Sequence, residues 1–127
     1  RSVVNKVNIS KLEVAAKEAA EQSNRLCLPK ISNITPLNQA ISEHNGSIIL
    51  MDESGAGASA KLKLVATKAE NPAIIVGPEG GFAEDELNFI RSQKSCIAIT
   101  LGDRILRAET AVIAALSLYQ GLAGDWS

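Results

Sequence analysis

Glycine is concentrated where the chain leaves a short apolar run. Residues 77–81 read Gly-Pro-Glu-Gly-Gly and directly follow residues 73–76, which read AIIV. Glycine permits positive φ and lets a ligand approach the backbone, whose exposed amides can bind polar groups. The pattern is neither G-x-G-x-x-G nor G-x-x-x-x-G-K-[ST], so it predicts neither a dinucleotide fingerprint nor a P-loop. A ligand-binding loop and a simple tight turn are both compatible with it.

A second segment, LGDRILR at residues 101–107, places two arginines around two aliphatic side chains. Arg104 and Arg107 frame Ile105 and Leu106, between an apolar run and a long apolar helix. Aliphatic side chains in such a loop suggest that they pack against another apolar surface. The apolar face of a ligand such as adenine is one possible partner. The alternative is that Ile105 and Leu106 pack into the hydrophobic core beneath the loop. Glu109 follows at the start of the helix, where a carboxylate also suits the positive end of the helix dipole.

Alternating helices and strands must position these two segments. Helical spacing and end signals predict helices over residues 10–24, 35–46, 83–93 and 108–122. Short apolar runs predict buried strands over residues 47–51, 73–76 and 96–100. Residues 52–59 read as a Gly/Ser-rich loop, and residues 59–68 favour a short helix. At the first helix start, Ser10 and Glu13 fit a capping box.

The alternation predicts an α/β fold with a mostly parallel sheet flanked by helices. In such sheets ligands bind beyond the carboxyl ends of the strands. We therefore expect the functional site in the loops that follow Met51, Val76 and Thr100.

Composition narrows the classes of function. A chain of 127 residues with 46% hydrophobic and 21% charged residues fits one globular domain, and no apolar run approaches the length of a membrane span. The net charge of −1 lacks the basic surplus of a free-standing nucleic-acid binder. Cys27, Cys96 and His44 are too few for a zinc site, so we expect no metal and reduced thiols in a cytosolic protein. The start at Arg1 suggests a fragment.

The order IIVGPEGGFAEDEL, then ITLGDRILRAETA, resembles the carboxyl-terminal motifs of the RsmE family. That family methylates N3 of a uridine in 16S ribosomal RNA and belongs to the SPOUT (trefoil-knot) methyltransferases. Weaker similarity extends back through AAKEAAEQSNRLCLPKI, so it covers nearly the whole chain. The resemblance implies a deep carboxyl-terminal knot, S-adenosylmethionine as cofactor, and a cytoplasmic homodimer with its active site at the subunit interface. It also implies that residues 1–127 lack an amino-terminal PUA-type RNA-binding domain and the first strand and helix of the knotted domain.

The chemistry of N3 methylation suggests roles for Arg107, Glu109 and Arg104, because a fixed guanidinium can stabilise developing negative charge. Arg107 would stabilise negative charge on the uracil as N3 loses its proton, Glu109 would orient Arg107 or accept that proton, and Arg104 would contact RNA. The resemblance implies cofactor contacts from Met51, Gly77, Pro78, Glu79, Gly80, Gly81, Leu101, Gly102, Ile105 and Leu106. Two alternatives stay open: another SPOUT enzyme, such as a ribose 2′-O-methyltransferase, and a non-catalytic module that binds the cofactor or a nucleotide.

Overall fold

The computed structural model describes residues 8–22, 28–52, 58–59, 69–78, 81–101 and 107–124. The chain divides into two compact units, one over Val3–Ala40 and the other mainly over Ile41–Ser127. The second unit holds the sheet and the predicted site. None of the helices in the described ranges is long and apolar enough to cross a membrane.

The first unit contains helix α1, Ile9–Gln22, and an extended segment over residues 28–36. The side-chain Oδ1 of Asn8 accepts a hydrogen bond from the Lys11 backbone amide at 3.0 Å, so Asn8 is the N-cap. The predicted capping box at Ser10 is therefore wrong, because Asn8 caps the helix two residues earlier and leaves Ser10 inside the first turn. Along α1, Leu12 is 45% exposed, whereas Ala20 is buried.

Helix α2, Leu37–Glu43, lies within the predicted helix over residues 35–46 and begins directly after Pro36. It ends three residues before Gly46, and the residues that follow lead into the sheet. All strands of that sheet belong to the second unit.

The second unit is built on a parallel sheet with strand order β2-β4-β1-β3. Its strands are β1 (Ile48–Met51), β2 (Ala58–Ser59), β3 (Ala73–Ile75) and β4 (Cys96–Thr100). All paired strands run parallel, which confirms the predicted α/β class with a parallel sheet. Strand β2 corrects the predicted loop over residues 52–59. Its two residues pair with β4, and a strand this short is decided by the edge it joins rather than by its own pattern. Residues 60–68, for which a helix was expected, lie outside the described ranges.

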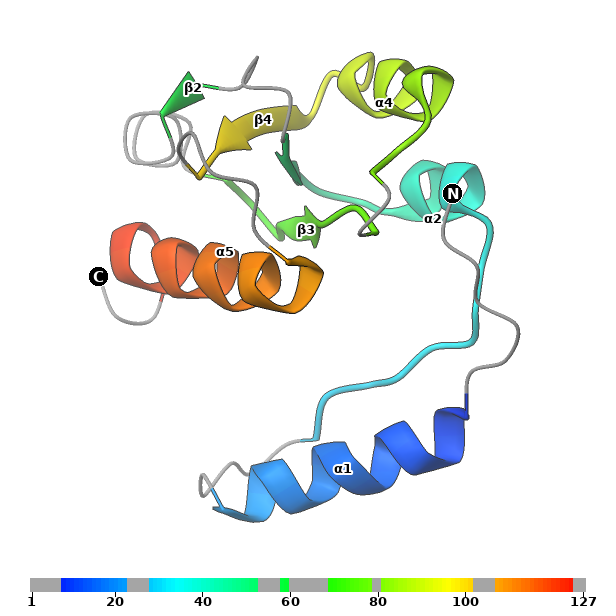
Figure 1. The fold of residues 1–127 in the computed structure, drawn as a ribbon, viewed down its shortest axis with the longest axis vertical. Helices are drawn as coiled ribbons and strands as arrows, with labels where there is room; N and C mark the ends of the chain where they lie inside the picture. Colours follow the sequence, from blue (N-terminus) through cyan, green and yellow to red (C-terminus); the bar gives the residue numbers. More distant parts are fainter. Residues whose placement is uncertain are drawn as a thin grey trace. The chain divides into compact units, whose positions relative to one another are not determined.

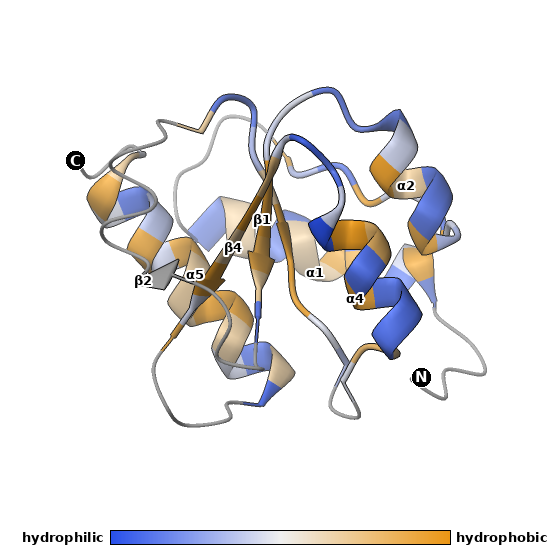
Figure 2. Cartoon of the chain, turned by 90° about the horizontal axis from the view of Figure 1, so that it is seen from above, coloured by the Kyte–Doolittle hydropathy of each residue, from blue (hydrophilic) through white to orange (hydrophobic). Residues whose placement is uncertain are grey.

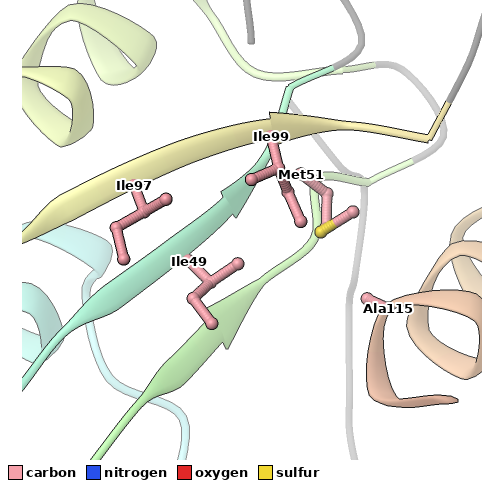
Figure 3. Close-up of a cluster of buried hydrophobic side chains, with 5 residues drawn as sticks. All are labelled: Ile49, Met51, Ile97, Ile99 and Ala115. Carbon is pink, nitrogen blue, oxygen red and sulfur yellow. The ribbon is translucent and has the colours of Figure 1, made fainter. Parts of the chain in front are cut away.

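Helices α4 (Glu84–Arg91) and α5 (Ala108–Leu122) cover opposite faces of this sheet (Figure 1). Successive strand residues point to opposite faces. Ile49, Met51, Ile97 and Ile99 point to one side and form the main buried cluster with Ala115 of α5 (Figure 3). Leu50 points to the other face, that of α4, where Ile90 is likewise fully buried. Strands β1 and β3 are accordingly apolar along their whole length (Figure 2).

A polar clamp fixes the amino ends of β1 and β3. The ring Nε2 of His44 lies 3.0 Å from the Asn71 carbonyl, and the Asn71 side-chain amide donates to the Asn45 carbonyl at 2.5 Å. The Ser47 amide donates to the Glu70 carbonyl at 2.9 Å. These bonds tie the turn before β1 to the turn before β3, and the register that follows pairs Ile48 with Ala73.

Candidate functional site

The parallel sheet brings the three predicted loops to one edge. Met51 pairs with Ile99, and Leu50 pairs with Ile75, so β1, β3 and β4 end at nearly the same level. Beyond those ends, Val76 and Leu101 pack against the buried cluster that contains Met51. The structure thus brings together Met51 and Leu101, two residues to which cofactor contacts were assigned.

Two positions of the glycine segment, residues 77–81, favour glycine for different reasons. Gly81 adopts φ +77°, a conformation that L side chains rarely adopt, and its amide donates to the Pro78 carbonyl at 2.8 Å. A Cβ on Gly77 would lie 3.0 Å from the Phe82 ring, so a side chain there would force that ring to move. Glu79 and Gly80 lie outside the described residues.

The second predicted segment is described only at its two ends. Leu101 is half-buried, while Gly102, Arg104, Ile105 and Leu106 lie outside the described residues. The predicted knot depends on loops that include this segment, so it stays a prediction.

Arg107 precedes α5 with extended backbone, and its carbonyl accepts the Ala111 amide at 2.8 Å. The side chains of Arg107 and Glu109 are both exposed. These two described residues form no ion pair with each other. An orienting contact from Glu109 to Arg107 is therefore not seen.

Met51 is the last residue of β1 and lies on the core side of the sheet edge. Its side chain is 5% exposed and extends from the end of β1 towards Ala115 (Figure 3). The thioether is thereby committed to the core rather than presented at the edge.

Sequence reasoning missed a buried ion pair at this edge. Asp52 directly follows β1 and is 3% exposed, and its Oδ2 accepts hydrogen bonds from Arg91 Nε at 3.0 Å and Nη2 at 2.7 Å. The Asp52 amide donates to the Ile99 carbonyl at 2.8 Å. An aspartate directly after a buried strand was a usable signal, but its partner lies 39 residues away at the end of α4.

The same pair influences Cys96, which carries a free thiol. Burial raises the pKa of the Cys96 thiol above its ordinary value, the Asp52 carboxylate raises it further, and the Arg91 guanidinium opposes both. Cys27, the other thiol, lies outside the described residues. Within the described ranges no cluster of three His, Cys, Asp or Glu side chains could hold a metal ion.

A parallel α/β sheet whose carboxyl edge carries Leu101 and the start of a glycine segment is typical of ligand-binding α/β proteins. Residues 1–120 match the family model described as "RNA methyltransferase domain", and the chain belongs to that family.

Two curated relatives share one name. "Ribosomal RNA small subunit methyltransferase E" of Rickettsia conorii is 38% identical over 112 residues, and that of Bacillus subtilis is 36% identical over 109 residues. The matches cover 87% and 80% of this chain but 46% and 42% of those proteins. The chain thus spans about half the length of the curated relatives it matches. The predicted resemblance to the RsmE family is confirmed.

Solved structures agree with the fold. The Neisseria gonorrhoeae ribosomal RNA small subunit methyltransferase E, bound to S-adenosyl methionine, is 26% identical with a TM-score of 0.81, over 98% of this chain and 54% of that one. A Legionella pneumophila protein in complex with the cofactor SAM is 28% identical with a TM-score of 0.75, over 91% of this chain and 50% of that one.

Proposed function

We propose that this chain is the cofactor-binding part of an S-adenosylmethionine-dependent methyltransferase that acts on N3 of a uridine in 16S ribosomal RNA. The observation that carries the proposal is the meeting of the glycine segment and the Leu101 end of the second segment at one sheet edge, in a chain of the RNA methyltransferase family. The names of the relatives support ribosomal RNA as substrate, and the two structures solved with S-adenosylmethionine support the cofactor.

The described residues fit this cofactor. Nothing lies within 4 Å of the position that a Cβ on Gly81 would take, so its backbone faces open space. Leu101 and Val76, half-buried and packed against the cluster that contains Met51, offer apolar surface at the ends of β4 and β3. Backbone polar groups next to apolar side chains suit a ligand that combines a purine with an amino-acid moiety. When bound, the cofactor supplies an electrophilic methyl group.

Arg107 and Glu109 provide the groups that the nucleophile needs. Loss of the N3 proton leaves negative charge on the neighbouring uracil oxygens, and a guanidinium stabilises such charge because it stays protonated and presents a planar fork of donors. Arg107 would fill this role from its exposed position before α5. Glu109, also exposed, would accept the proton, and Arg104 would contact RNA.

A homodimer is part of the proposal. Along α5, Val112, Ile113 and Leu116 are 39%, 66% and 49% exposed. They share a helix face with Glu109, because residues three, four and seven positions apart align. A second copy that covered this face would bring the Glu109 end of α5 to the interface. A homodimeric enzyme that modifies ribosomal RNA would act in the cytoplasm.

Calorimetric titration of the full-length protein with S-adenosylhomocysteine tests the cofactor assignment. We expect saturable binding that is lost in Gly81→Gln and retained in Gly121→Gln, because Gly121 lies on an exposed part of α5 with open space around it. Absence of binding by the unsubstituted protein would overturn the assignment.

The position of the methyl group is tested by primer extension on 16S ribosomal RNA treated with the full-length protein and S-adenosylmethionine. An N3 methyl group blocks Watson–Crick pairing and stops the polymerase, whereas a ribose 2′-O-methyl group leaves pairing intact. A strong stop at one uridine supports the proposal, and methylated RNA that is read through supports the ribose alternative.

A further inference from the structure

The Asp52–Arg91 pair occupies the place where the first loop of the site begins. Asp52 is the first residue beyond β1, and its amide still bonds to Ile99 of β4. Its carboxylate is 1% exposed, whereas the Arg91 side chain is 33% exposed and enters from α4. The direction of the chain as it leaves β1 is therefore set by a contact with a helix on one face of the sheet.

Helix α4 connects this contact to the glycine segment. The helix begins at Glu84, three residues after Gly81, and the Glu86 carboxylate accepts the Ala83 amide at 2.8 Å, which fixes the helix start. Its last residue is Arg91. Because an α-helix is stiff over two turns, a bond at Arg91 constrains the position of the Gly81–Ala83 end as well.

A buried ion pair is a poor way to gain stability alone, because desolvation of the two charges offsets much of their attraction. It is a good way to impose geometry, since the planar guanidinium donates two hydrogen bonds in a fixed direction. In this pair both Nε and Nη2 donate to the same carboxylate oxygen. The pair thus fixes both distance and orientation between the end of β1 and the end of α4.

We propose that Asp52 and Arg91 are positioning residues for the cofactor site, and that their bond holds the end of β1 and the Gly81–Ala83 turn before α4 at the spacing that cofactor binding requires. This inference rests on the proposed function. As positioning residues, the two act on cofactor affinity rather than on the chemical step.

The test compares variants of the full-length protein by calorimetry with S-adenosylhomocysteine and by steady-state kinetics. Arg91→Met keeps the aliphatic stem and removes the fork, Arg91→Lys keeps the charge, and Asp52→Asn with Arg91→Met removes both charges so that no buried carboxylate is left unpaired. Lys94→Met is the matched control, because it removes an exposed positive charge three residues beyond Arg91.

We expect Arg91→Met and the double variant to weaken S-adenosylhomocysteine binding about tenfold and to raise KM for the cofactor similarly. At saturating cofactor, kcat should stay within about twofold, and Arg91→Lys should restore part of the affinity. Lys94→Met should match the unsubstituted protein. Cooperative thermal unfolding shows whether the double variant is folded. If it is folded and binds S-adenosylhomocysteine with unchanged affinity, the pair is only structural and the inference is overturned. If the unsubstituted protein itself does not bind, the proposed function fails, and the inference fails with it.

Discussion

Arg107 is the residue on which the proposed chemistry depends most. It directly precedes α5, has no ion-pair partner among the described residues, and its backbone is anchored by the first turn of that helix. An anchored backbone with an exposed side chain suits a group that must reach an incoming base.

Replacement of Arg107 by Ala should lower kcat by about 10²–10³, because a fixed donor to developing negative charge is lost. The affinity for S-adenosylhomocysteine should be unchanged. Arg107→Lys should recover only part of the rate, since an ammonium lacks the planar fork. Single-turnover methylation and calorimetry on the same variants check this, and unchanged turnover in Arg107→Ala would remove Arg107 from the mechanism.

Cys96 leads to a prediction about how stability depends on pH, also at the scale of a single residue. Its pKa is raised in the folded protein above its ordinary value of 9.0, first by burial and then by Asp52, against the opposing effect of Arg91. Above that ordinary value the unfolded chain loses the thiol proton while the folded chain keeps it, so unfolding becomes more favourable. This contribution to stability is complete below the unfolded pKa and is lost as pH rises through the folded pKa.

The unsubstituted protein should therefore lose more stability than Cys96→Ala between about pH 8 and pH 10. Urea unfolding of both proteins across this range measures the difference, and the alanine variant is the reference that contains every pH effect except that of Cys96. Parallel pH profiles would contradict the raised pKa.

At the scale of elements, the turn before β1 decides how two strands pair. Gly46 has φ +155°, and a Cβ there would overlap the Asn71 carbonyl oxygen and lie 3.0 Å from the Glu70 oxygen. The hydrogen bonds of the clamp occupy the same space, so a side chain at this position competes directly with the register of β1 on β3.

Gly46→Ala should lower the free energy of unfolding by about 1–3 kcal/mol. Gly121→Ala is the opposite case, because that glycine lies inside α5 and nothing lies within 4 Å of the position that an added Cβ would take. It should stabilise by roughly 0.5–1 kcal/mol through helix propensity. Denaturant unfolding of the two variants gives both values, and a neutral Gly46→Ala would show that the clamp can relax.

At the scale of the whole molecule, the exposed apolar stripe of α5 is the surface proposed for a second copy. Ile113→Asp should convert the proposed dimer to a monomer, because it places a charge in the middle of that stripe. Asn88→Asp adds the same charge at an exposed position of α4 and should leave the dimer intact. Light scattering after size-exclusion chromatography measures both, and a dimeric Ile113→Asp would place the interface elsewhere.

Local patterns in the sequence determined the class of fold and indicated the sheet edge proposed to carry the site. The runs SIILM, AIIV and CIAIT became β1, β3 and β4 within a residue at each end, and the predicted helix from Ala108 to Leu122 has those bounds in the structure. Long apolar runs and helical periods report burial that any compact packing must satisfy, so they can be recognised without knowledge of the partners. The motifs around Gly77 and Arg107 indicated the family, which the family model confirmed.

Tertiary structure decided what depends on a partner distant in the chain. Strand β2 exists because it meets the edge of β4, and the clamp at Asn71 joins turns that are separated by more than twenty residues. The Asp52–Arg91 bond links residues on two elements. Each of these features is a pairwise contact, and one sequence records the two partners without recording that they meet. The alternation of helices and strands is set by local chemistry, whereas the spacing within the site is set by contacts that only the folded chain creates.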